Sequence, residues 1–125
     1  MKRELDMQLV AKHAAIFEGG RFRYFECGPG WYTLIDEMAT ALQSHIEASG
    51  CEQVKAHQFK EKFGEVRFYF DGGDDTCRDI VHQAEQRSLV VCDLCGEPGK
   101  LGNTGGWLAV RCETHSQMKR GDFEG

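Results

Sequence analysis

The chain of 125 residues has room for one domain with a small appendage, and its 41% hydrophobic and 28% charged residues favour a folded protein over a disordered one. A formal net charge of −5 at pH 7 disfavours a nonspecific nucleic-acid binder, which needs a basic surface. No long apolar run is present, so we expect no membrane helix, and the acidic Glu4 and Asp6 after Lys2 and Arg3 do not fit a signal peptide. These features predict a cytoplasmic protein.

Two helices are expected in the first 50 residues. Apolar residues at roughly helical spacing predict the first over residues 4–17, ended by Gly19 and Gly20. After a short alternating segment, 21–26, and a Cys27-Gly-Pro-Gly30 turn, the spacing from Trp31 to Ile46 predicts a helix that ends near Gly50. His45 lies on the apolar stripe of this helix, which favours a buried, hydrogen-bonded histidine over a ligand or a base.

Residues 54–59 and 65–70 have the alternation of two strands, and the short segment between them predicts a β-hairpin. Val66, Phe68 and Phe70 share one face. We expect one core between helices and hairpin, with these members: Trp31, Met38, Leu42, Phe68, Phe70 and Ile80.

The acidic turn at 71–75 leads into a helix over 76–88. Asp74 or Asp75 is expected to cap that helix, because a carboxylate accepts hydrogen bonds from the free amides of the first turn. A calcium loop is the alternative for Asp71, Asp74 and Asp75. The segment lacks the glycine and the distal glutamate of such a loop, so capping is favoured.

The strongest pattern in the sequence is a pair of short cysteine and histidine motifs. Cys92-x-x-Cys95 and Cys112-x-x-His115 are joined by a glycine-rich connection, which is typical of a structural zinc site. Two residues between ligands allow a tight turn to aim both side chains at one tetrahedral ion, and Gly96 permits the positive φ of that turn. We therefore predict zinc bound by Cys92, Cys95, Cys112 and His115.

A redox motif or a disulfide is the alternative use of Cys92 and Cys95. A redox pair needs a helix that begins at the motif, whereas Pro98 and Gly99 disfavour one here. The other cysteines, Cys27, Cys51 and Cys77, have no ligand spacing and are interpreted as buried small apolar residues in a reducing cytosol.

Residues 100–111 are expected to form a second hairpin, and Cys112 to begin a short terminal helix before a frayed tail at 122–125. Together these elements predict an α+β fold, with two or three helices packed on a small antiparallel sheet or hairpin. A treble-clef-like zinc module would follow. The predicted division is a body of residues 1–91 and a zinc-binding module of residues 92–125.

Several motifs from Phe25 to His115 carry a resemblance: Cys27-Gly-Pro-Gly-Trp31, Lys60-Glu-Lys-Phe-Gly64, Arg67-Phe-Tyr69, Cys92-x-x-Cys-Gly96, Gly106-Trp107 and Cys112-x-x-His115. In this order they resemble a group of small, mostly uncharacterised proteins of bacteria and their phages. The N-terminal thirty residues match poorly. The resemblance implies a role beside a toxin, as an immunity protein, or in a mobile element.

The function expected from these features is binding, not turnover. An acidic immunity protein can place carboxylates in the basic active-site cleft of a toxin, and the candidate contacts are Asp71, Asp74, Asp75 and Glu61. Candidate aromatic anchors are Tyr24, Phe25, Phe63 and Tyr69.

Two other classes of function remain open. A phage or mobile-element protein that binds nucleic acid is the main alternative, because zinc modules commonly serve that role, although no segment has a convincing basic footprint. An enzyme is disfavoured because four protein ligands leave no open position on a zinc ion. No residue spacing in this sequence indicates a cysteine nucleophile paired with a histidine base.

Overall fold

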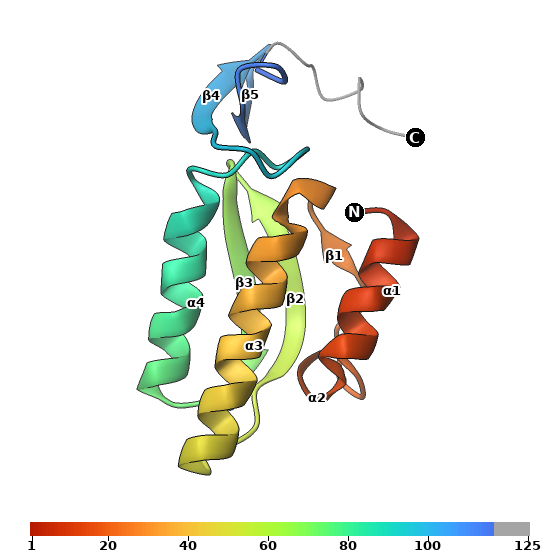
Figure 1. The fold of residues 1–125 in the computed structure, drawn as a ribbon, viewed down its shortest axis with the longest axis vertical. Helices are drawn as coiled ribbons and strands as arrows, with labels where there is room; N and C mark the ends of the chain where they lie inside the picture. The colour runs from red at the N-terminus through yellow and green to blue at the C-terminus, as the bar shows by residue number, and fades with distance from the viewer. Residues whose placement is uncertain (117–125) are drawn as a thin grey trace.

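The computed structural model describes residues 1–116 and has an α+β fold (Figure 1). Its helices are α1 (Arg3–Lys12), α2 (Ala14–Phe17), the single 3-10 turn η1 (Pro29–Trp31), α3 (Tyr32–Ser49) and α4 (Asp75–Ser88). Figure 1 shows α3 and α4 side by side against the larger sheet, with α1 on the side of α3 away from α4. No helix among the described residues combines the length and the apolar character needed to span a membrane.

The strands form two separate sheets: β1 (Phe25–Glu26), β2 (Lys55–Lys62) and β3 (Glu65–Asp71) in one, and β4 (Lys100–Thr104) and β5 (Trp107–Arg111) in the other. Both predicted hairpins, β2–β3 and β4–β5, are therefore confirmed as antiparallel pairs. The larger sheet is not purely antiparallel, because β1 pairs in parallel with β2 through Phe25 and Phe59. The alternation over residues 21–26 does mark an extended segment, but a strand of two residues carries no pattern that reveals its partner or its direction.

The core lies between the larger sheet and the helices, and the predicted strand faces are confirmed. Val66 and Phe68 are buried, Phe70 is partly buried, and Tyr69 on the opposite face is 45% exposed. Three of the other predicted core residues are buried: Trp31, Met38 and Leu42. The fourth, Ile80, is partly buried. A chain of aromatic contacts with centroid distances from 4.7 to 6.1 Å links six rings: Phe17, Phe22, Phe25, Phe59, Phe68 and Phe70.

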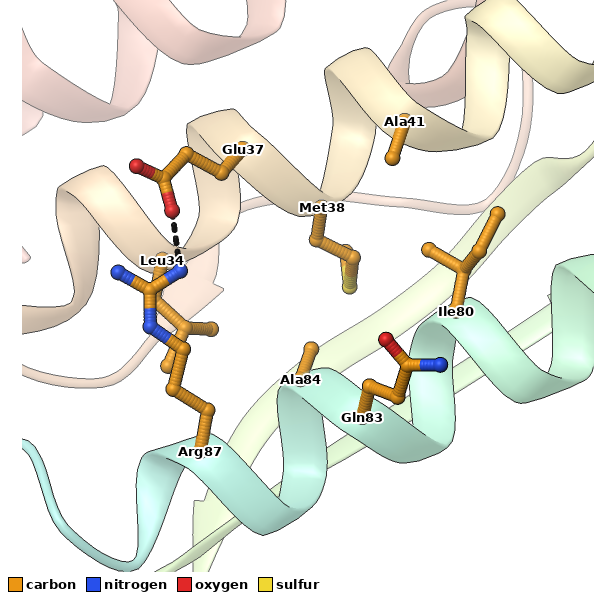
Figure 2. Close-up of a pocket in the computed structure, with 8 residues that line it drawn as sticks. All are labelled: Leu34, Glu37, Met38, Ala41, Ile80, Gln83, Ala84 and Arg87. Carbon is orange, nitrogen blue, oxygen red and sulfur yellow. Dashed lines mark hydrogen bonds and ion pairs between the residues drawn. The ribbon is translucent and has the colours of Figure 1, made fainter.

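Ile80 is only partly buried because a groove runs between α3 and α4 (Figure 2). Met38 and Ala84 line its floor, and an ion pair between Glu37 and Arg87 spans the helices at one end. The ion pair joins exposed side chains, so we expect little net stabilisation from it.

The prediction of one continuous N-terminal helix over residues 4–17 is wrong, because the chain forms two helices there. His13, with φ −119° and ψ 44°, separates α1 from α2. Its buried side chain points to α3, where Nε2 lies 2.7 Å from Oδ1 of Asp36, and this pairing holds the pKa of Asp36 below its ordinary value. The helical periodicity is the same on both sides of the break, so only the tertiary contact reveals it.

The ends of the two long helices follow the rules used to predict them. Gly50 has φ 72°, and its N–H donates to the carbonyl of Ile46, as a C-terminal glycine should. Asp74 is the cap of α4, with Oδ1 accepting from the N–H of Cys77 at 3.0 Å. The hydrogen bond from His45, followed by that from Cys77, lowers the pKa of Asp74 to about 2.

The helix expected to begin at Cys112 is not found among the described residues, because 113–116 form turns. The frayed tail expected at 122–125 lies outside the described residues.

We expect Phe68→Ala to lower the free energy of unfolding by about 3–5 kcal/mol, because it removes a buried ring and leaves a cavity among Phe17, Phe59 and Phe70. Urea denaturation measures this loss. Tyr69→Ala, on the exposed face of the same strand, is the matched control and should cost much less. Equal losses in the two variants would contradict the assignment of the strand faces.

Candidate metal centre

The first half of the candidate metal centre is a tight turn that follows α4. Gly96, with φ 82°, closes it by donating its N–H to the carbonyl of Cys92 at 2.9 Å. The N–H of Cys92 in turn donates to the carbonyl of Glu97 at 2.8 Å. These bonds keep Cys92 and Cys95 on one side of the turn, as the two-residue spacing predicts.

The second half begins where β5 ends. Cys112 follows the last residue of that strand, and the N–H of His115 donates to the carbonyl of Cys112 at 3.2 Å. Pairing of β4 with β5 returns the chain to the first turn, where Val91 forms an isolated bridge with Pro98. Of the sixteen residues between the two motifs, 100–111 form the hairpin that brings the motifs together.

The four predicted ligands converge, and their ligand atoms all lie within 4.8 Å of one another. Sγ of Cys95 is 3.6 Å from Sγ of Cys112, and Nδ1 of His115 is 3.7 Å from Sγ of Cys92 and 3.2 Å from Sγ of Cys112. Zinc bonds of about 2.3 Å to sulfur and 2.0–2.1 Å to nitrogen require ligand separations of about 3.8 and 3.5 Å in a tetrahedron. The spacing fits such an ion.

Burial differs among the four ligands in a way that suits a structural ion. Cys92 and Cys112 are buried, His115 is half-buried and Cys95 is exposed. Three thiols and one imidazole form a set typical of structural zinc sites, with all four positions of a tetrahedral ion filled by protein. This arrangement can hold together two segments of chain, and it offers no free position for a substrate.

The loop before α3 packs directly on the metal-binding turn. The N–H of Gly30 donates to the carbonyl of Asp93 at 2.9 Å, and Nε1 of Trp31 donates to the carbonyl of Val91 at the same distance. A Cβ atom at Gly28 or Gly30 would overlap the backbone carbonyl oxygens of Asp93 and Cys92. The glycines are therefore required by a close approach of two backbones.

An ion pair lies beneath the turn. Nε of Arg111 is 2.6 Å from Oδ1 of Asp93, and both side chains are almost completely buried. Burial raises the pKa of Asp93, and the neighbouring Arg111 opposes that shift. Because each charge neutralises the other away from water, removing one partner is expected to destabilise the segment around the metal-binding turn.

The sequence analysis did not predict this ion pair or the role of Gly28 and Gly30. The available signals were an aspartate inside Cys-x-x-Cys and a Gly-Pro-Gly segment.

The four carboxylates predicted to contact a partner do not share one surface. Asp71, Asp74 and Asp75 lie where β3 meets α4, whereas Glu61 lies at the other end of the β2–β3 hairpin. Asp71 pairs with His57 at 2.6 Å. Asp74 caps α4, Asp75 pairs with Arg78, and Oε2 of Glu61 accepts from the N–H of Gly64 at 2.7 Å. A single contact surface can therefore include Glu61 or the three aspartates.

The expectation that the three remaining cysteines are buried is correct for Cys77 alone. Cys27 and Cys51 are only partly buried against the core. They lie in the loops that flank α3, where the chain leaves the packed elements. His45 is likewise half-buried, although hydrogen-bonded as expected.

The prediction of Phe25 as an aromatic anchor is wrong, because Phe25 is buried in the core. The other three candidate anchors, Tyr24, Phe63 and Tyr69, are exposed.

Comparison of the chain with protein-family models, with curated proteins and with solved structures gives no match.

Replacing one ligand should remove one equivalent of metal. Cys92→Ser leaves an incomplete set of ligands, so we expect elemental analysis of the purified protein to show one zinc ion fewer per chain than in the wild type. Cys27→Ser is the matched control, because Cys27 is outside the set of four. Unchanged zinc content in Cys92→Ser would contradict the assignment.

The packing of the glycine loop on the turn predicts an effect on metal affinity without any change of ligand. Gly30→Ala should weaken zinc binding by about 10- to 100-fold in chelator competition, because the added methyl group displaces the turn that holds Cys92 and Cys95.

The matched control is Gly102→Ala, because Gly102 in β4 has open space around the position of a Cβ atom. Equal zinc affinity in the two variants would show that the turn forms independently of the loop.

Proposed function

We propose that this is a zinc-stabilised protein that binds and neutralises another protein, as an immunity protein inhibits a bacterial toxin. The observation that carries the proposal is an exposed aromatic side chain, Phe63, held on a tight turn. This turn lies beside the segment of residues 92–116 that contains the four candidate ligands, here called the metal module. The four ligands Cys92, Cys95, Cys112 and His115 are proposed to bind Zn²⁺ with a structural role.

Phe63 occupies a position that is unfavourable for both its backbone and its side chain. Lys62 pairs with Glu65, so Phe63 and Gly64 form a two-residue hairpin loop, with φ values of 54° and 84°. Such loops prefer Asn, Asp or Gly at the first position. Within residues 1–116, Phe63 is the one non-glycine residue with positive φ, and it is 65% exposed. An exposed phenylalanine in such a backbone conformation supports a role in binding.

The turn that carries Phe63 is supported from two sides. Glu61 accepts a hydrogen bond from the N–H of Gly64, and the side chain of Leu101 in β4 packs directly against Gly64. Phe63 also lines a shallow hollow with Trp107 and residues of the β4–β5 turn. The metal module therefore stiffens the surface that presents this side chain. A rigid aromatic group loses little conformational entropy on binding, which suits an anchor.

Electrostatic attraction supports a basic partner. The net charge of −5 favours encounter with the basic active-site cleft of a toxin that acts on nucleotides or nucleic acid, and such an encounter slows as salt rises. Of the four candidate carboxylates, Glu61 lies beside Phe63 and belongs to the proposed contact surface. A reducing cytoplasm would keep the thiols available for the metal.

Nucleic-acid binding is the second candidate, on the outer face of the larger sheet. Nζ of Lys60 lies 5.9 Å from the ring centroid of the exposed Tyr69, and Arg67 is on the same face. However, Arg67 forms an ion pair with Glu65, and Glu26 lies opposite Lys60 in the sheet register. A face with acidic groups among its basic groups is a weak phosphate-binding surface, so protein binding is favoured.

The variant Phe63→Asn separates stability from binding. Asparagine suits the first position of this turn, so we expect a gain of about 0.5–1 kcal/mol in the free energy of unfolding, measured by urea denaturation. Loss of the aromatic anchor should weaken binding of the partner at least tenfold. The matched control is Met7→Gln, which replaces an exposed apolar residue of α1 and should leave binding unchanged.

The partner for this test is the product of the adjacent upstream gene, co-expressed with the wild type and with each variant. Rescue of growth and a stoichiometric complex are expected with the wild type and with Met7→Gln, and weaker rescue with Phe63→Asn. A product that is neither toxic alone nor bound by the wild type would contradict the immunity role. A salt-sensitive gel shift with duplex or single-stranded DNA would then favour the second candidate.

A further inference from the structure

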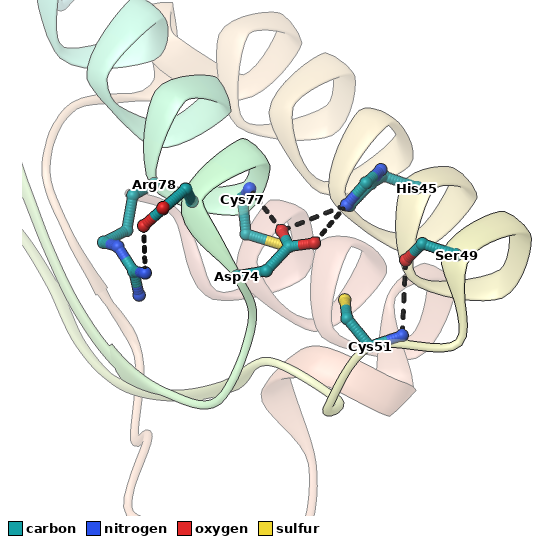
Figure 3. A network of polar contacts seen from close by, with 7 residues as sticks. His45, Ser49, Cys51, Asp74, Cys77 and Arg78 are labelled. Atoms are coloured by element: carbon teal, nitrogen blue, oxygen red, sulfur yellow. Dashed lines mark hydrogen bonds and ion pairs between the residues drawn. The ribbon is translucent and has the colours of Figure 1, made fainter.

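A second group of side chains with metal-binding chemistry lies between the end of α3 and the start of α4 (Figure 3). His45 comes from the last turns of α3, Cys51 from the loop after it, Asp74 from the cap of α4 and Cys77 from the first turn of α4. Their ligand atoms all lie within 4.8 Å of one another. Nε2 of His45 is 3.0 and 2.9 Å from the two carboxylate oxygens of Asp74.

The backbone places these four residues together through contacts between the two loops. Gly50, in the left-handed conformation, ends α3 and turns the chain, and the N–H of Cys51 then donates to Oγ of Ser49 at 3.2 Å. The N–H of Gly73 donates to the carbonyl of Glu52 at 2.9 Å and thereby joins the loop of Cys51 to that of Asp74. A side chain at Gly73 would press on Cys77, so this position also requires glycine.

We propose that His45, Cys51, Asp74 and Cys77 bind a second zinc ion. Two thiols, one imidazole and one carboxylate are all ligands of Zn²⁺, and four of them complete a tetrahedron. On binding, the thiols release their protons, and Nε2 of His45 exchanges its contact with Asp74 for the ion. One oxygen of Asp74 accepts from the N–H of Cys77 and the other is available as a ligand.

Helix capping and core packing do not account for the whole group. Capping of α4 requires Asp74 alone, and packing accounts for the buried Cys77. His45 and Cys51 are half-buried, so neither is enclosed in the core, and their exposed side gives an ion access from solvent. The group lies at the opposite end of α3 and α4 from the first metal centre, and the inference is independent of the immunity role (Figure 1).

The test measures zinc stoichiometry in the full chain, kept reduced, by zinc titration followed by elemental analysis after removal of free ion. The wild type should bind close to two zinc ions per chain, and Cys51→Ser and His45→Ala, both at partly exposed positions, should each bind one. Cys92→Ser should also bind one, at the second group. Cys27→Ser, with a cysteine outside both groups, should retain both ions.

Cobalt binding to Cys92→Ser gives a separate readout of the second group. In this variant we expect the absorption of tetrahedral cobalt with thiolate ligands, and its loss when Cys51→Ser is added. A wild type that binds one ion, with the same stoichiometry in Cys51→Ser, would overturn the proposal. A disulfide between Cys51 and Cys77 that persists under reducing conditions and leaves no cobalt signal would overturn it as well.

Discussion

The structure depends on a close approach of two backbones, that of the Gly28–Gly30 loop and that of the turn containing Cys92 and Asp93. The hydrogen bond from the N–H of Gly30 to the carbonyl of Asp93 is possible only where no side chain separates the two segments. The loop leads into α3, and the turn follows α4, so this contact joins the metal centre to the main core. Whatever holds the turn in place also holds the beginning of the longest helix.

The pair formed by α3 and α4 is joined at both ends. At one end, Trp31 donates to the carbonyl of Val91 beside the metal-binding turn. At the other end, His45 contacts Asp74, the residue that caps α4. Between these contacts the helices pack through apolar side chains, with a groove left at their outer edge. Two metal-binding groups at the two ends would resist separation of the helices more effectively than exposed ion pairs, which contribute little.

Rigidity of this kind has a consequence for binding. The turn that presents Phe63 packs against Leu101 of the metal module, so this contact restricts movement of the turn relative to β4. A protein that acts by occupying a partner's cleft gains affinity when its contact surface is ordered before binding. A structural ion far from any substrate can therefore contribute to function through the stiffness of the surface beside it.

Features that depend on neighbouring residues could be predicted from the sequence by itself: the spacing of Cys92 and Cys95, the faces of β3, the cap at Asp74 and the glycine that ends α3. Each arises from backbone geometry within a few residues, so a local pattern is sufficient. Only the tertiary structure decided the break at His13, the parallel pairing of β1, the packing of Gly30 on Cys92 and the meeting of Cys51 with Cys77. These depend on contacts between segments distant in the chain, and such contacts have no periodicity or fixed spacing to reveal them.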